Sequence, residues 1–355
     1  MTETSRLATC VGTTTHRGCH RSNNEDSLRT VGSLSLVADG MGGHEAGEVA
    51  SSIAVQTVAG AELFRTEAFE VPAEEEAAGS RGVFRRRKAT SALNARIMRI
   101  LAEVKEIIGD ADEGIKTAGR LRAGTTLTGC WLTRVGEQDL WIVFNVGDSR
   151  TYRLRREAGH SLDDRSLGSI STSPLQGISL EQITVDHSEV QYLVDSGQIT
   201  ALEALTHPRR NVITRALGTG SYWEPDFWVI PAHPGDRLML CSDGLSGELS
   251  NEYMARVLAT VKHPKDAADV LQAAAIRSGG RDNISVVVVD AVPAGSCRNH
   301  GCDGDTDGMH QRQEEEEVLD LESWNSGRLS DPSQDGSRPD GPVGTGETTV
   351  DGEAR

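Results

Sequence analysis

Four aspartates stand beside apolar runs that have the composition of buried strands. They are Asp39 after LSLVA (34–38), Asp148 after WIVFNVG (141–147), Asp243 after LMLCS (238–242) and Asp282 just before ISVVVV (284–289). A carboxylate at the end of a buried strand is held rigidly and partly dehydrated, so several that converge repel one another unless a cation lies among them. Oxygen ligands alone select hard cations such as Mg²⁺ or Mn²⁺ and not zinc.

A second interpretation of the same acids competes with the metal site. Asp-Gly is a common turn dipeptide, and a single ADG after a strand is more often a turn than a ligand. Four such positions support a metal site better than a single position would. Spacing alone still leaves a metal site and a set of ordinary turns about equally well supported.

The elements around these acids can be predicted from hydrophobic pattern. Short runs rich in β-branched or aromatic residues predict strands at 34–38, 126–132, 140–146, 237–241 and 284–290. Small and apolar residues at helical spacing predict helices at 44–63, 91–108, 188–196, 250–261 and 265–278. Because strands and helices do not strictly alternate, the pattern favours an α/β or α+β domain.

Three stretches lack such periodicity. Residues 65–90, which pass from acidic to basic, and the Ser- and Gly-rich residues 155–180 are expected to be surface loops. After Ala294 the composition predicts a disordered tail. Within it, Asp303–Glu314 matches a calcium-loop pattern, but the Pro and Gly residues that precede the pattern argue against an EF-hand.

Composition bounds the class of protein. The 355 residues carry a net charge of -17, so neither nucleic acid nor an anionic membrane is the expected partner. Six cysteines in a chain this long do not make a disulfide framework, and the sequence begins without the pattern of a signal peptide. The longest apolar stretch, 284–292, is too short to span a bilayer. We therefore expect a cytoplasmic protein in a reducing compartment.

Eight motifs occur in an order that resembles one known family. They are RSNNEDS (21–27), VADGMGGHEAGEVAS (37–51), GTTLTG (124–129), NVGDSRTYRL (145–154), DHSEVQYLVDSGQIT (186–200), HPRRNVITRALGTG (207–220), GDRLMLCSDGLSGELS (235–250) and GGRDNISVVVVD (279–290). Together they resemble the metal-dependent protein phosphatases, the type 2C serine/threonine phosphatases, in their bacterial form. The resemblance runs from about residue 6 to residue 292.

The resemblance implies a fold and a domain organisation. The expected fold is a four-layer α-β-β-α sandwich of two antiparallel sheets flanked by helices, in the α+β class. A catalytic domain would occupy residues 1–293, with insertions near 65–90 and 155–180 and a mobile flap at 186–220. Residues 294–355 would form the acidic tail.

The resemblance also implies roles for individual residues. Asp39 would bridge two metal ions, and the carbonyl of Gly40 would bind one of them. Asp243 and Asp282 would complete the second site, and Asp148 would bind a weaker third ion. Asp26 would hold water bound to the metals.

Two further roles concern the phosphate and the leaving group. Arg21 would bind the substrate phosphate, which a guanidinium grips through two parallel hydrogen bonds. In animal members the histidine proposed as the general acid lies at the position of Met41, so His44 does not match it. His44 is therefore either the proton donor to the leaving group or a support for its loop.

The resemblance predicts the function of the chain. It would be a hydrolase that uses metal-activated water in a binuclear Mn²⁺ or Mg²⁺ site to dephosphorylate phosphoserine and phosphothreonine in proteins. Its partners would be serine/threonine kinases or their substrates, and it would be a monomer. Two alternatives stay open: a phosphatase dedicated to one regulatory phosphoprotein, such as an anti-sigma-factor antagonist, and a non-catalytic phosphoprotein-binding scaffold.

Overall fold

The computed structural model describes residues 6–42, 46–66, 68–70, 82–119, 123–156, 177–220 and 222–296, and only the backbone of residues 82–90. These residues lie in the first of two units of the chain, Met1–Asp307. The second unit, Gly308–Arg355, falls outside the described residues, as does the calcium-loop pattern Asp303–Glu314.

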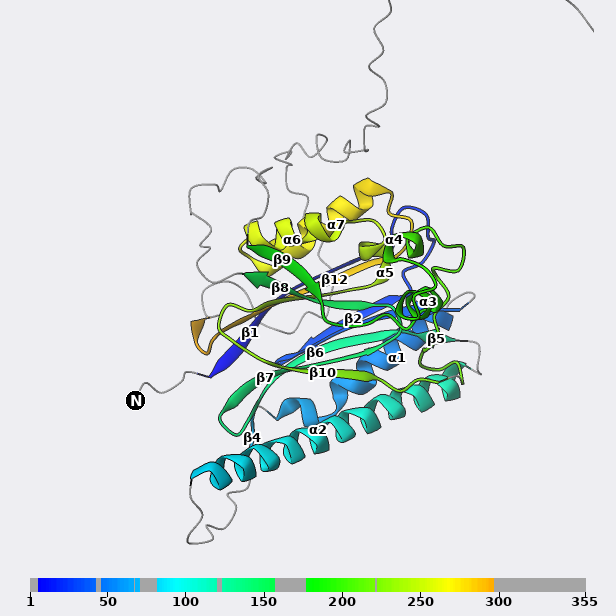
Figure 1. Cartoon of the computed structure of the whole chain (residues 1–355). Helices are drawn as coiled ribbons and strands as arrows, with labels where there is room; N and C mark the ends of the chain where they lie inside the picture. The colour runs from blue at the N-terminus through cyan, green and yellow to red at the C-terminus, as the bar shows by residue number, and fades with distance from the viewer. Residues whose placement is uncertain are drawn as a thin grey trace, which may run out of the picture. The chain divides into compact units, whose positions relative to one another are not determined.

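Two β-sheets lie at the centre of the first unit (Figure 1). One has the strand order β1 (Leu7–His16), β12 (Ile284–Pro293), β11 (Arg237–Cys241), β8 (Arg150–Arg156) and β9 (Ile178–Gln182). The path of the other is β10 (Asp226–Pro231), β7 (Gln138–Val146), β6 (Leu127–Val135), β3 (Leu34–Met41) and β2 (Asp26–Val31). Along both paths neighbouring strands are antiparallel. Two short strands join the second sheet: β4 (Ala68–Phe69) is parallel to β6, and β5 (Gly124–Thr125) pairs with the end of β3.

Helices cover the outer face of each sheet. The helices α1 (Ala46–Gly60) and α2 (Gly82–Gly119) lie on the second sheet, with α1 against β2 and β3 and α2 against α1. The helices α6 (Asn251–Thr260) and α7 (Pro264–Ser278) lie on the first sheet. Shorter helices are η1 (Glu62–Arg65), α3 (Glu189–Asp195), α4 (Ala201–Ala204) and α5 (Asp243–Ser246). The predicted four-layer α-β-β-α sandwich is therefore confirmed (Figure 1).

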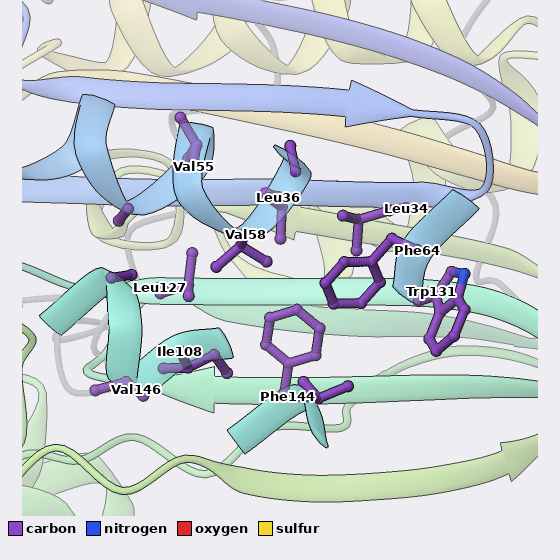
Figure 2. Close-up of a cluster of buried hydrophobic side chains, with 14 of the residues drawn as sticks. Leu34, Leu36, Val55, Val58, Phe64, Ile108, Leu127, Trp131, Phe144 and Val146 are labelled. Atoms are coloured by element: carbon purple, nitrogen blue, oxygen red, sulfur yellow. The ribbon is translucent and has the colours of Figure 1, made fainter. Parts of the chain in front are cut away.

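Alternation along the strands explains how one strand serves two cores. In β3, Leu36 and Ala38 pack with α1 and α2, whereas Val37 points between the sheets. Because successive side chains of a strand face opposite ways, a strand that is buried on both faces has an unbroken run of apolar residues. Figure 2 shows the helix-side core, where the rings of Phe64 and Trp131 meet edge to face with centroids 5.0 Å apart. In the part of the chain that the structure describes, no helix has the length and apolar character that crossing a bilayer requires.

The loop prediction at 65–90 is wrong in its second half. Helix α2 begins at Gly82, and Ala68–Phe69 forms β4. Arg, Lys and Ala are good helix formers, and a helix stabilised by packing farther along can propagate into a segment without an apolar stripe. At 155–180, β8 continues to Arg156 and β9 begins at Ile178, so both ends of that predicted loop are strand.

Candidate functional site

Strand pairing places Asp26 opposite Asp39. They are register partners on the antiparallel strands β2 and β3. The backbone of Asp39 is held from the other side, because its N–H donates to Thr126 Oγ1 over 2.9 Å. Its carbonyl accepts from Thr126 N–H and Thr125 Oγ1, both over 2.9 Å. These bonds fix the point at which the Asp39 side chain leaves the sheet.

The other sheet supplies two further acids at one edge. Asp243 opens α5 immediately after β11, and Asp282 stands just before β12. The end of β11 pairs with the start of β12, with Cys241 opposite Val286, so both acids lie at the same edge. Asp148 lies in the turn between β7 and β8, which connects the two sheets. The four strand-end acids singled out in the sequence, together with Asp26, thus converge.

Dehydration and mutual repulsion raise the pKa values of four acids in this cluster. Burial, with the charges of Asp243 and Asp282 nearby, raises the pKa of Asp26 to about 7 despite a hydrogen bond from Ser242. Burial and the charge of Asp243 likewise raise the pKa of Asp148 to about 7. Burial and repulsion from its acidic neighbours hold the pKa of Asp39 well above its usual range. The pKa of Asp243 is also raised, by burial and by Asp282.

The donor set fits a hard divalent cation. All five side chains offer only carboxylate oxygens, and Oδ1 of Asp26 is buried without a hydrogen-bond partner. Among the described residues, no three His, Cys, Asp or Glu side chains are oriented so that they could hold one metal ion together. One cation of the chain already lies among them, because Arg21 donates to Asp282 Oδ2 over 2.6 Å. The positive charge of Arg21 offsets part of the repulsion among these acids.

Arg21 lies at the rim of the cluster. Its Nη2 donates to Asp282 Oδ2 over 2.6 Å, and its side chain is 54% exposed. The hydrogen bond to Asp282 raises the pKa of Arg21, and the charges of Glu25 and Asp39 add to the effect. The guanidinium is therefore accessible to a ligand while it stays beside the acids.

Asn283 positions the loop that carries Arg21, and the sequence interpretation did not single it out. Its Nδ2 donates to the carbonyls of Arg17 and Asn23, both over 2.9 Å, and its Oδ1 accepts from Glu25 N–H over 2.8 Å. Ser242 has a similar role, because its Oγ donates to Asp26 Oδ2 over 2.7 Å. The polar residues next to Asp282 and Asp243 were the available signal in the sequence.

The glycine-rich segment after Asp39 allows close packing. A Cβ on Gly40 would lie 2.2 Å from the carbonyl oxygen of Gly47, and one on Gly47 would lie 2.6 Å from Glu25 Oε2. The end of β3 and the start of α1 can therefore approach only because both residues lack side chains. His44 and its neighbours 43 and 45 fall outside the described residues. The choice between the two roles predicted for His44 stays open.

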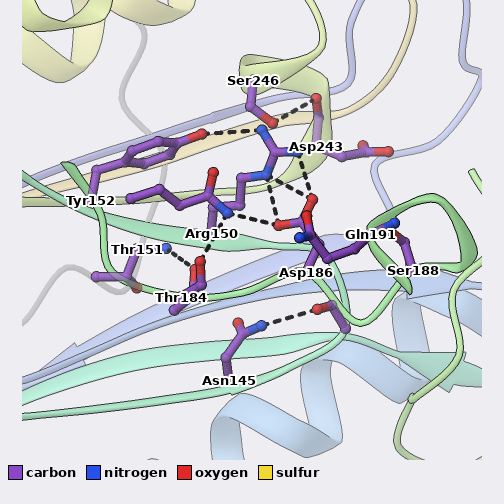
Figure 3. Close-up of polar contacts among 12 residues, drawn as sticks. Asn145, Arg150, Thr151, Tyr152, Thr184, Asp186, Ser188, Gln191, Asp243 and Ser246 are labelled. Carbon is purple, nitrogen blue, oxygen red and sulfur yellow. Dashed lines mark hydrogen bonds and ion pairs between the residues drawn. The ribbon is translucent and has the colours of Figure 1, made fainter. Parts of the chain in front are cut away.

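The turn that carries Asp148 is clamped by the start of the predicted flap. Nδ1 of the buried His187 accepts from Gly147 N–H over 3.1 Å, and His187 N–H donates to the Gly147 carbonyl over 2.9 Å. Burial lowers the pKa of His187. Figure 3 shows Arg150 beside Asp243, where its Nη2 and Nε donate to Asp186 over 2.6 and 2.9 Å. The beginning of 186–220 is thus tied to the acid cluster.

Comparison with known proteins gives a consistent result. The family model described as Protein phosphatase 2C matches residues 18–275. The serine/threonine protein phosphatase PstP of Mycobacterium tuberculosis is 37% identical over 278 residues, which are 78% of this chain and 44% of that protein. The chain therefore spans less than half the length of that relative.

Two further matches cover nearly all of the chain they are compared with. The serine/threonine phosphatase stp of Listeria innocua is 32% identical over 282 residues, 78% of this chain and 93% of that protein. A crystal structure of the catalytic domain of PstP in complex with two manganese ions is similar with a TM-score of 0.58 and 30% identity. That match covers 81% of this chain and all of the other.

Proposed function

This chain belongs to the protein phosphatase 2C family, and from that premise we propose that it is a metal-dependent phosphatase acting on phosphoserine and phosphothreonine in proteins. The observation that carries the proposal is the convergence of mutually repelling acids, the buried Asp26 and the part-buried Asp39, Asp148 and Asp243, with Asp282 at one end of the sandwich. Such a cluster is costly to bury unless it serves to bind cations.

We assign the metal ligands as follows. Asp39 and the carbonyl of Gly40, together with Asp243 and Asp282, would hold two Mn²⁺ or Mg²⁺ ions, and Asp148 would hold a third. When bound, such ions lower the pKa of water and neutralise the charge of a transferring phosphoryl group. Support comes from the oxygen-only donors, the unpartnered Asp26 Oδ1 and the manganese complex of the PstP catalytic domain.

The remaining chemistry falls to other residues of the chain. Arg21 would bind the phosphate dianion through its exposed guanidinium and orient it for in-line attack. Asp26 would accept a hydrogen bond from the attacking water at its unpartnered Oδ1. The leaving serine or threonine oxygen requires a proton, and His44 is one candidate donor.

The wider organisation is part of the same proposal. Residues 1–293 would form the catalytic domain with its flap at 186–220, and residues 294–355 an acidic tail. The enzyme would act in the cytoplasm as a monomer and oppose serine/threonine kinases in signal transduction. The free thiols of Cys10, Cys19, Cys130 and Cys241 support a reducing compartment.

Phosphate release from a phosphothreonine peptide tests the proposed activity. The full chain should release phosphate in the presence of Mn²⁺ and stop when EDTA is added. A phosphoproteome compared with and without the protein would then separate a broad enzyme from one dedicated to a single regulatory phosphoprotein. Metal binding with no turnover on any phosphopeptide would favour the scaffold alternative and refute the enzyme.

A further inference from the structure

A buried aspartate on α2 holds a backbone amide far away in the sequence. Asp112 is 1% exposed, and its Oδ1 accepts from the N–H of Gly218 over 2.7 Å. Its other oxygen lies 2.6 Å from Nζ of Lys116, one helical turn further on. The same helix buries Ile108, Ala111 and Ile115. Burying a carboxylate on such an apolar face costs free energy, so the bond of Asp112 to Gly218 must do more than fill space.

The residue that Asp112 holds is pressed against the helix. Gly218 has a φ of +82°, which side chains rarely adopt. A Cβ at this position would lie 2.2 Å from Cγ2 of Ile115 and 2.9 Å from the carbonyl oxygen of Ala123. The hydrogen bond and the close contact together fix Gly218 between α2 and the start of β5, at the C-terminal end of the 186–220 segment.

A continuous set of covalent and hydrogen bonds leads from Gly218 to the acid cluster. The preceding residue, Leu217, pairs with Thr125, donating to its carbonyl over 2.9 Å and accepting from its N–H over 3.1 Å. Thr125 is in turn the register partner of Gly40, and its Oγ1 donates to the carbonyl of Asp39. Three hydrogen-bonded contacts and one peptide bond therefore link Asp112 to the two residues assigned to the metals.

We propose that Asp112 is a positioning residue for the metal site: by holding Gly218 it fixes the Leu217–Thr125 pair and, through it, the backbone of Asp39 and Gly40. This inference rests on the proposed phosphatase function. Thr125 donates to the Asp39 carbonyl and is the register partner of the adjacent Gly40, so a shift of Thr125 would displace both residues. The helix α2 thereby sets the affinity of the site for divalent cations, although it supplies none of the assigned ligands.

Calorimetric titration of the full chain with Mn²⁺ tests the inference. Asp112→Ala removes the acceptor and should raise the Kd for Mn²⁺ by roughly two- to thirtyfold, the range for residues that act through a contact network. Asp112→Asn keeps a side-chain oxygen that can accept the Gly218 N–H and should stay near the wild-type Kd. Asp110→Ala, at an exposed position on the same helix, is the matched control and should bind Mn²⁺ as the wild type does.

Coupling between two sites acts in both directions, which allows a second measurement on the unmodified protein. If Asp112, Gly218 and the metal site are coupled, Mn²⁺ binding must stabilise the Gly218 contact, so hydrogen exchange in a peptide covering 213–219 should slow when Mn²⁺ is added. This readout remains available if Asp112→Ala does not fold.

The outcomes separate the inference from the proposed function. A wild-type chain with neither Mn²⁺ binding nor Mn²⁺-dependent hydrolysis would refute the phosphatase. An active wild type with unchanged exchange at 213–219, or an Asp112→Ala variant that melts earlier but keeps the wild-type Kd, would refute only the positioning role.

Discussion

The guanidinium of Arg21 lies 2.6 Å from the carboxylate of Asp282, although 261 residues separate them in the sequence. One is the proposed phosphate ligand and the other a proposed metal ligand. A cation that takes Asp282 competes with Arg21 for the same oxygen, and thereby leaves the exposed guanidinium available for phosphate. Metal binding and phosphate binding are thus linked through one ion pair.

Replacement of Arg21 should separate these two events. Arg21→Ala should lower kcat/KM for a phosphothreonine peptide by about 10- to 100-fold, as expected for loss of charge-assisted hydrogen bonds. It should leave Mn²⁺ affinity equal or higher, because a positive charge beside Asp282 is removed. Steady-state kinetics and calorimetry measure the two effects. Weaker Mn²⁺ binding in Arg21→Ala would show that Arg21 supports the metal site instead.

The raised pKa values of Asp26 and Asp148, each about 7, predict how stability depends on pH in the metal-free protein. Both groups keep their protons in the folded chain up to about pH 7 but lose them near pH 4 in the unfolded chain. Between these values the folded state binds more protons, so the contribution of these two groups to stability should fall as pH rises from about 4 to 7 and then level off. Thermal denaturation in EDTA across this range measures the trend. Stability that rises over the whole interval would contradict it.

Metal binding should reverse this fall in stability with rising pH. A cation among the acids favours their charged forms, so Mn²⁺ binding near pH 6 should release protons, and fewer should be released above pH 8. Calorimetry in buffers of different ionisation enthalpy counts these protons. Equal proton release at both values would mean that Asp26 and Asp148 do not titrate as described.

Asn283 should control the loop that carries Arg21. Asn283→Ala removes hydrogen bonds to the backbone of Arg17, Asn23 and Glu25. We expect a loss of about 1–3 kcal/mol in the free energy of unfolding, because three part-buried hydrogen bonds to backbone groups are lost, and a raised KM for phosphopeptide. Asn251→Ala, at the exposed start of α6, is the control and should change neither quantity. An unchanged KM in Asn283→Ala would remove the assigned positioning role.

Two glycines of α1 should differ sharply in their tolerance of alanine. A Cβ on Gly47 would meet Glu25 Oε2 at 2.6 Å and the carbonyl carbon of Gly40 at 2.9 Å, whereas one on Gly60 meets nothing within 4 Å. Gly47→Ala should cost about 1–3 kcal/mol and weaken Mn²⁺ binding, since the end of β3 must move. Gly60→Ala should be neutral or slightly stabilising. Chemical denaturation compares the pair, and equal stabilities would refute the close approach.

The sequence predicted the strands that are buried on both faces. All five predicted strands are interior ones, namely β3, β6, β7, β11 and β12, whereas β1, β9, β10 and β2 lie at the ends of the two strand orders and were missed. An edge strand such as β9, with the sequence ISLEQ, is half-exposed and lacks the continuous apolar run on which the prediction depends. The interior strand β8 was also missed, because its sequence RTYRLRR is dominated by arginines.

The site was predictable to a similar extent. Acids at the ends of interior strands must converge once those strands pair, so the meeting of Asp39, Asp148, Asp243 and Asp282 followed from the pattern together with the family resemblance. The supports provided by Asn283, Ser242 and Asp112 did not, because each bonds to a group that is distant in sequence and that only tertiary structure brings near. The assigned role of each acid stays a prediction.

The central claim is that Asp39 holds the metals that activate water. The most direct test is Mn²⁺ titration of the wild type and of Asp39→Asn, paired with phosphate release from a phosphothreonine peptide by the same samples. The amide keeps the shape of the side chain but removes the negative charge with which Asp39 would hold the cations. The account predicts weakened Mn²⁺ binding and loss of turnover in Asp39→Asn. Undiminished Mn²⁺-dependent phosphate release by that variant would contradict it.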